Sequence, residues 1–269
     1  TNMVLDALFV AALGWGLPGA AAATALSQFV GGAIPLVYFL RPNSSALRLG
    51  RFRFDGRALV RCCTNGSSEF INNIAMSVVG SLYNLQLMKY AGEDGIAAYG
   101  VLMYVSMIFA AIFIGYSVGV APVVGYHYGA QNREELHGLL VKSLRLISIG
   151  AVAMCIAGEV LAGPLARLYV GYDAELLAMT KRAFFFFSFS FLFCGFSMFG
   201  SSFFTALNDG LVSASISALR TCVFQIVCVF VLPLLYGLDG IWGALTVSEI
   251  LSVAVVVIFL LANRKKYGY

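Results

Sequence analysis

Four long runs of this chain contain no aspartate, glutamate, lysine or arginine. They are Leu17–Leu40, Phe70–Met88, Gly95–Asn132 and Ala183–Asn208. A helix needs about 20 predominantly apolar residues to cross the hydrocarbon core of a bilayer, so each run is long enough to be a membrane span. Backbone amides find no water inside lipid, so helices and closed β-barrels are the possible spanning structures. The runs lack the alternating pattern of barrel strands, and we therefore predict membrane-spanning helices.

The composition excludes a soluble fold of this size. Hydrophobic residues make up 60% of the 269 residues and charged residues 11%, whereas roughly a quarter of the residues are charged in soluble domains. A water-facing shell would lack the polar residues to cover it. We predict an all-α, polytopic membrane helical bundle. Its spans are expected at residues 3–14 (incomplete), 18–40, 59–88, 94–122, 137–161, 180–206, 211–235 and 239–262.

Lysine and arginine are distributed unevenly between the predicted loops. The segment Arg41–Arg61 contains six arginines and a single acid, Asp55. Over the short loops, twelve basic residues fall on the side of this segment and of the C-terminus, and four on the opposite side. Because cytoplasmic loops carry the excess of basic residues, we expect a multi-pass cell-membrane protein with this linker and the C-terminus in the cytoplasm. The net charge of +4 is therefore a matter of topology and does not indicate nucleic-acid binding.

The sequence Gly16–Gln28 is similar to the sequence Gly237–Glu249. Both follow the pattern G-L-x-G-x-x-x-A-x-x-x-S-Q/E at a tight turn before a span; shared composition is the alternative explanation. Repeated halves are typical of transporters, whose substrates bind between the halves. We interpret the chain as most of the second half of a transporter. The expected domains are 1–40 (the last one and a half spans of a first bundle), 41–57 (a cytoplasmic basic linker), 58–263 (a six-helix bundle) and 264–269 (a cytoplasmic tail).

The segment Pro122–Asn132 reads P-V-V-G-Y-H-Y-G-A-Q-N. It resembles the P-x-x-G-Y-x-Y-G-A-x-N loop after the eighth span of the multidrug and toxic compound extrusion (MATE) transporters, and Gly66–Phe70 is similar to their seventh span. The resemblance covers the whole chain. It implies two six-helix bundles around a cavity, with export of organic cations against inward H⁺ or Na⁺. The first four spans of that pattern are absent, so we expect an N-terminally truncated transporter whose partner is the missing N-terminal bundle of the same protein.

A polar face runs along the predicted span 59–88 and contains one acid, Glu69. Its members recur at three- and four-residue steps; they are Asn65, Glu69, Asn72, Asn73, Met76, Gly80 and Asn84. An ionisable residue inside a span is costly and is therefore a functional candidate. A carboxylate for which a coupling ion and a cationic substrate compete would link their movements. We expect Glu69, with Asn65, Asn72 and Asn73, to carry the cation coupling; the alternative is a glutamate that only binds neighbouring helices.

Aromatic and methionine side chains are candidates for a surface that contacts the substrate. Aromatic faces attract cations, and flexible methionines suit promiscuous binding. Most phenylalanines of the run Ala183–Asn208 are nonetheless expected to face lipid or to pack against other helices. The expected substrate cavity consists of Met76, Tyr83, Asn84, Tyr104 and Phe199.

Arg220 and Glu249 form a second candidate pair. Each lies ten residues from the nearer end of its predicted span, counted from Gly210 and from Asp239. Both therefore fall near mid-depth on consecutive antiparallel spans, where pairing would offset the loss of hydration of both charges. We expect a structural ion pair in preference to a binding site.

The sequence contains no Walker A loop, no G-x-S-x-G and no H-E-x-x-H motif, so an enzyme is not predicted. The six cysteines lack metal-site spacing, and we expect no metal and no cofactor apart from H⁺ or Na⁺ as the coupling ion. The favoured function is a secondary antiporter that exports cationic amphiphilic drugs. The alternatives are a lipid-linked saccharide flippase of the same superfamily, which should line its cavity with arginine and lysine, and a non-transporting membrane assembly subunit.

Overall fold

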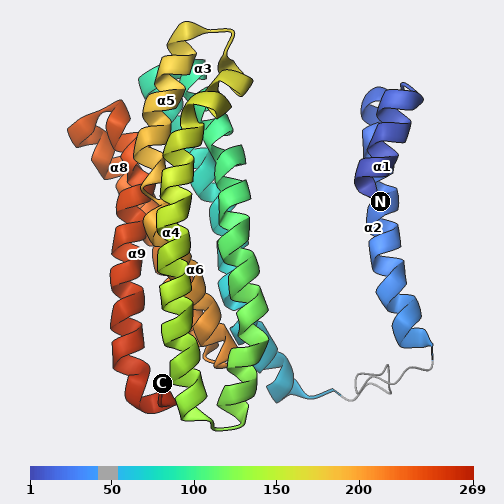
Figure 1. The fold of residues 1–269 in the computed structure, drawn as a ribbon, viewed down its shortest axis with the longest axis vertical. Coiled ribbons are helices and arrows are strands. Elements are labelled where there is room, and N and C mark those ends of the chain that lie inside the picture. The colour runs from blue at the N-terminus through green and yellow to red at the C-terminus, as the bar shows by residue number, and fades with distance from the viewer. Residues whose placement is uncertain (42–53) are drawn as a thin grey trace. The chain divides into compact units, whose positions relative to one another are not determined.

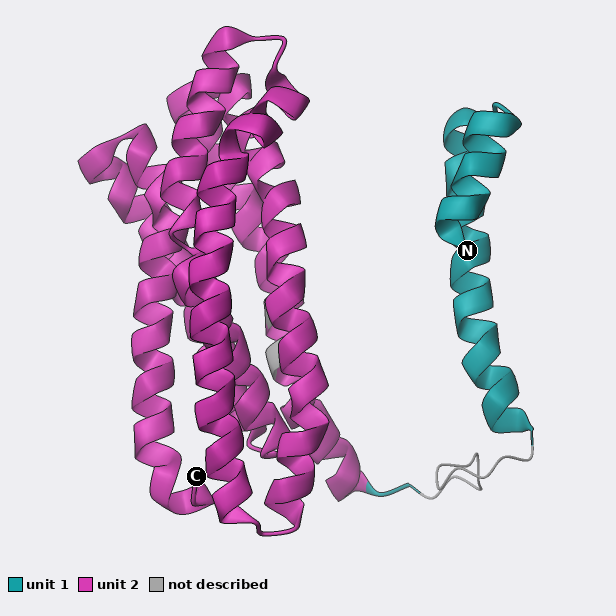
Figure 2. Cartoon of the chain, in the orientation of Figure 1, with its two compact units in different colours: residues 1–55 teal, residues 56–269 magenta. Residues whose placement is uncertain are grey.

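The computed structural model describes residues 1–41 and 54–269, without the side chains of residues 68, 69 and 72. All regular elements in these ranges are helices. The chain divides into two compact units, residues 1–55 and 56–269, which Figure 2 shows in different colours. Most of the predicted basic linker 41–57 lies outside the described residues.

Unit 1 is a short helical segment that turns back into one long helix. It comprises α1 (Asn2–Asp6), the π-helix η1 (Ala7–Ala12) and α2 (Gly16–Leu40). Gly14 and Gly16 have positive φ angles of 65° and 56°, which glycine adopts without steric cost. The rings of Phe9 and Trp15 stack at 5.2 Å across this turn. The predicted half span 3–14 and full span 18–40 are therefore both present as helices.

Unit 2 contains the remaining helices. They are α3 (Gly56–Gly129), α4 (Arg133–Val170), α5 (Ala174–Ser188), α6 (Phe191–Ala206), α7 (Gly210–Ala218), the π-helix η2 (Leu219–Phe224), α8 (Gln225–Tyr236) and α9 (Leu238–Tyr267). Helix α3 is folded at Gly92, whose backbone is not helical (φ 64°, ψ −149°). Its two arms lie side by side (Figure 1), and Tyr83 of the first arm stacks on Tyr99 of the second at 5.0 Å. The bend separates the predicted spans 59–88 and 94–122.

Two further spans of unit 2 are each assembled from neighbouring helices. Helices α5 and α6 are bent by 48° at a short break and together match the predicted span 180–206, whereas Gly210–Tyr236 forms one span from α7, η2 and α8. Residues 56–269 thus contain six spans: two in α3 and one each in α4, α5–α6, α7–α8 and α9. The predicted all-α membrane bundle is confirmed.

The two copies of the internal repeat share two local features. Gly16 and Gly237 both have positive φ, 56° and 58°. Three residues later, Gly19 and Gly240 press against the preceding segment: an added Cβ would lie 3.1 Å from the Phe9 carbonyl oxygen in one copy and 2.8 Å from the Pro233 nitrogen in the other. Small residues of this kind let membrane helices approach closely. The repeated pattern therefore marks a tight turn at the start of α2 and of α9.

Helix α6 lies within the core of unit 2 and packs against α3, α4, α7 and α9. Its Phe199, Phe203 and Phe204 are at most 2% exposed, so these phenylalanines pack between helices. Four hydroxyl groups tie α6 to α7: the Oγ of Ser201 lies 3.0 Å from that of Ser213 and 2.9 Å from that of Ser217, and Thr205 Oγ1 lies 2.6 Å from Ser213 Oγ. Interhelical hydroxyl contacts of this kind contribute to association where no hydrophobic force acts between spans.

Candidate functional site

The first arm of α3 has a buried side and an exposed polar side. Ala75, Val79 and Tyr83 are at most 4% exposed and pack into unit 2. The opposite side exposes Asn73, Met76, Ser77, Ser81 and Asn84, with Gly80 half-buried. Side chains four residues apart share a face of a helix, which explains the separation. The polar face predicted from the sequence is thus directed away from the unit 2 core over residues 73–84.

The predicted coupling residues lie at the start of this arm. Glu69 and Asn72 belong to α3, but their side chains fall outside the described residues. Asn65 is half-buried, and its Oδ1 has no hydrogen-bond donor among the described residues. An added Cβ at Gly210 would lie 2.7 Å from the Asn65 Cα, so the start of α7 packs directly on this turn of α3.

Arg220 and Glu249 form the predicted ion pair inside unit 2. Nε of Arg220 donates to Oε1 and Oε2 of Glu249 at 2.9 and 3.1 Å, and Nη2 donates to Oε1 at 2.8 Å. The side chains are 14% and 1% exposed. Arg220 lies on the π-helix η2 and Glu249 on α9, and π-bulges often occur at functional sites. The forked guanidinium matches the carboxylate, so both charges are satisfied by each other.

A sequence model of the MatE family matches residues 70–231, more than half of the chain. The chain belongs to the MatE family. It is 28% identical over 271 residues to the multidrug export protein MepA of Staphylococcus saprophyticus and 25% identical over 267 residues to MepA of Staphylococcus haemolyticus. Each alignment covers 98% of this chain and 58% of the relative, so the chain spans less than two thirds of the length of these relatives.

Solved structures show the same fold. An outward-facing multidrug resistance MATE family transporter of the MOP superfamily superposes with a TM-score of 0.89, and a MATE in complex with MaL6 with 0.87. Both are 21% identical to this chain, and the match covers 99% of this chain and 60% of the other. The resemblance to MATE transporters inferred from the sequence is confirmed, and the relatives that the chain matches are multidrug export proteins and not enzymes.

The MATE-like segment Pro122–Asn132 forms the end of α3 and the turn into α4. Gln131 has a positive φ of 56°, and the side-chain oxygen of Asn132 accepts a hydrogen bond from the Glu135 N–H at 3.2 Å. Asn132 is thus the N-cap of α4, satisfying a backbone donor that the helix itself cannot. In this MatE protein the motif builds a tight inter-span connection.

The predicted substrate cavity needs correction for two residues. Tyr83 and Phe199 are 3% and 2% exposed and lie in the core of unit 2, so neither presents a surface to a ligand in this structure. Met76 and Tyr104 are 69% and 65% exposed, and Asn84 is also exposed. An aromatic side chain at mid-span can pack in the core of a bundle or line the wall of a cavity, and periodicity does not distinguish the two.

Sequence reasoning missed a polar cluster where α9 ends. Asp209, the N-cap of α7, accepts hydrogen bonds from Val212 N–H at 3.3 Å, from Lys266 Nζ at 2.8 Å and from the Tyr267 hydroxyl. Tyr267 and Tyr269 are 8% and 5% exposed. The sequence offered one signal, the position of Asp209 before a helix. Its partners Lys266 and Tyr267 lie 57 and 58 residues away, so their contact with it was not predictable. The cluster joins the α6–α7 turn to the end of α9.

The Asp209 cluster predicts a pH-dependent contribution to stability. Burial by itself raises the pKa of the Asp209 carboxyl, but hydrogen bonds from Lys266, Tyr267 and Val212 outweigh it and hold the pKa below its ordinary value of 3.8. The charged form is therefore the stabilising one: the contribution is present above the ordinary value and disappears as the pH falls through the lowered pKa. We expect Asp209→Asn to lower the free energy of unfolding by about 1 kcal/mol at neutral pH.

Thermal unfolding of the purified protein in detergent, at neutral and at strongly acidic pH, measures this effect. Asp239→Asn is the matched control, because Asp239 pairs at 2.5 Å with Arg182, whose side chain is 66% exposed, and such surface pairs contribute little. The difference between wild type and Asp209→Asn should vanish in acid. A difference that persists there would show that the charge of Asp209 is not its source.

Proposed function

We propose that the complete protein containing this chain is a secondary antiporter that exports cationic amphiphilic compounds in exchange for H⁺ or Na⁺. The observation that carries the proposal is membership of the MatE family together with the similarity to MepA multidrug export proteins over nearly the whole chain. Six spans in one unit and a tight turn repeated before α2 and α9 fit half of a two-bundle transporter. The expected partners are organic cations, the lipid bilayer and the first bundle.

The polar face of α3 supports an aqueous pathway beside unit 2. Asn73, Ser77, Ser81 and Asn84 are exposed on one side of a span that is otherwise apolar. A row of polar groups is disfavoured against hydrocarbon and is favoured beside water or another polar surface. We propose that this face lines the transport cavity of the complete protein, with Glu69, Asn65, Asn72 and Asn73 as the coupling site. The exposed Met76, Asn84 and Tyr104 remain the proposed substrate contacts.

The flippase alternative is less well supported. A cavity for phosphates needs basic groups that are free to bind them, and Arg220, the chief basic residue within the spans, is neutralised by Glu249 at 2.8 Å. A guanidinium already held in a bidentate pair has few donors left for a second anion. The buried pair therefore favours export of cations over movement of phosphorylated lipids.

Transport by the complete protein in proteoliposomes tests the proposed function. Export of a fluorescent organic cation is followed after a pH gradient or a Na⁺ gradient is imposed separately. We expect one of the two gradients to drive accumulation of the dye against its own gradient. Movement that neither gradient drives would refute the antiporter and favour a flippase or a pore.

Access of impermeant labels to single cysteines in the linker and the tail tests their proposed cytoplasmic location.

A further inference from the structure

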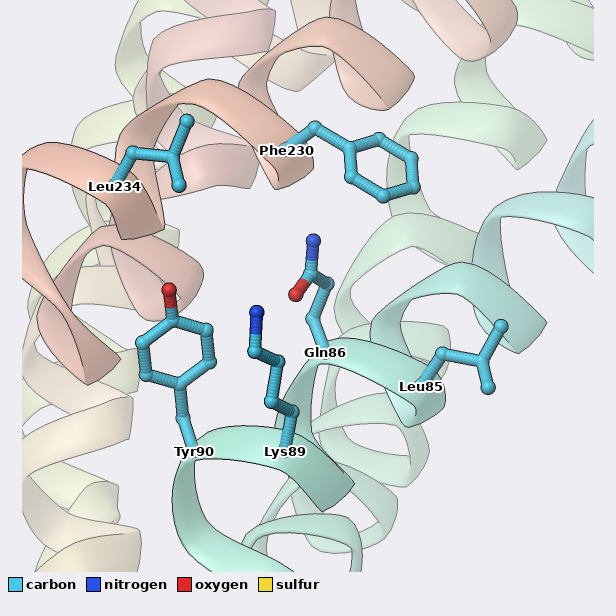
Figure 3. A pocket seen from close by; sticks show the side chains of 6 residues that line it. All are labelled: Leu85, Gln86, Lys89, Tyr90, Phe230 and Leu234. Atoms are coloured by element: carbon cyan, nitrogen blue, oxygen red, sulfur yellow. The ribbon is translucent and has the colours of Figure 1, made fainter.

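A pocket opens between the first arm of α3 and α8, away from the polar face. It has a volume of about 420 Å³ and is lined by Leu85, Gln86, Lys89, Tyr90, Phe230 and Leu234. Figure 3 shows the polar ends of Gln86, Lys89 and Tyr90 rising from α3 toward Phe230 and Leu234 of α8. The volume falls within the usual range of small-molecule sites.

The walls of the pocket are suited to an amphiphile. Leu85, Phe230 and Leu234 are 68%, 45% and 76% exposed, as expected for side chains that contact lipid tails. The ammonium group of Lys89, the amide of Gln86 and the hydroxyl of Tyr90 supply hydrogen-bond donors in the same space. An apolar wall with donors at one end matches a molecule that has a hydrocarbon part and an anionic head.

Lys89 is a cation without an acidic partner in the described part of the chain. Its Nζ lies 5.6 Å from the centre of the Tyr90 ring, while no described carboxylate, including those of Glu93 and Asp94 at the bend, lies within ion-pair distance of it. Lys89 precedes Gly92, where α3 turns. A lysine near the end of a span extends its ammonium toward the headgroup layer, where lipid phosphates are the available anions.

We propose that this pocket is a binding site for an anionic phospholipid. Lys89 contacts the headgroup phosphate, Gln86 and Tyr90 donate hydrogen bonds to the headgroup, and the acyl chains lie against Leu85, Phe230 and Leu234. The lipid thereby joins the end of the first α3 arm to α8. The positive charge disfavours the organic cations of the proposed function, so this site takes a different class of ligand and does not depend on that function.

Lipid binding to the complete purified protein tests this site. Native mass spectrometry in detergent compares phosphatidylglycerol with phosphatidylcholine of the same acyl chains. One lysine near a membrane surface changes affinity for anionic lipid by about fivefold. We therefore expect Lys89→Ala to weaken phosphatidylglycerol binding about fivefold and to leave phosphatidylcholine binding unchanged. Lys89→Arg should bind phosphatidylglycerol about as well as wild type. Lys181→Ala, which lies outside the pocket, should have no effect on binding of either lipid.

Three results would overturn the proposal. Equal losses for both lipids in Lys89→Ala would assign the effect to packing, and an unchanged phosphatidylglycerol affinity would place the lipid elsewhere. Inorganic phosphate could also displace the lipid, to the same extent in wild type and in Lys181→Ala. That result would make the pocket a site for soluble anions. Lys89→Gln, which retains a long polar side chain, provides the same comparison if Lys89→Ala does not fold.

Discussion

Replacing Arg220 by alanine is expected to lower the free energy of unfolding by about 3–5 kcal/mol. The change leaves Glu249, which is 1% exposed, without the guanidinium that now binds both of its oxygens. A buried carboxylate cannot regain its hydration in the folded protein, so its charge is left without a partner. Thermal and denaturant unfolding of the purified protein in detergent measures the loss.

The double variant Arg220→Met/Glu249→Leu is the control for this prediction. It removes both charges and retains apolar volume, and replacing a whole buried pair in this way is often neutral or stabilising. We expect its stability to be near that of wild type. If the single and double variants were equally unstable, packing around η2 and not the unpaired charge would be responsible. Transport by a stable double variant then separates a structural role, which leaves export intact, from a direct role in export.

Replacing Glu69 by glutamine in the complete protein is expected to reduce ion-driven export by about tenfold or more, within the usual range of coupling between two sites. Glutamine keeps the shape of the side chain and removes the charge for which the coupling ion and the cationic substrate are proposed to compete. Dye accumulation in proteoliposomes under the driving gradient measures the loss. Binding of the dye without a gradient should lose its dependence on pH or Na⁺.

Glu159→Gln is the matched control for this second prediction. Glu159 is a half-buried carboxylate in α4, outside the polar face of α3. We expect its replacement to leave the coupling intact. Unchanged gradient-driven export in Glu69→Gln would rule out the proposed coupling role, and an equal loss in both variants would point to a general effect of carboxylates in the spans.

The sequence alone determined the number, kind and order of the spans. Charge-free runs of about 20 residues without the alternation of barrel strands form helices in lipid, because a helix bonds its own backbone groups. Because this requirement is local, the spans 59–88 and 94–122 and the break between them, near Gly92, were predictable without knowing which helices pack against them. The motif Pro122–Asn132 likewise predicted the family, which the match over residues 70–231 confirms. Its turn with a capping asparagine is formed by adjacent residues.

Only the tertiary structure decided which side of each helix is inside. In a membrane the core of a bundle is no more apolar than the lipid around it, so periodicity does not separate Phe199 in the core from Met76 on the surface. Contacts between residues distant in the chain, such as Asp209 with Tyr267, depend on how the helices pack. The Arg220–Glu249 pair was predictable because a charge inside a span is energetically costly and needs an opposite charge at the same depth. The uncharged Tyr83 has no such requirement, so its place in the core was not predictable.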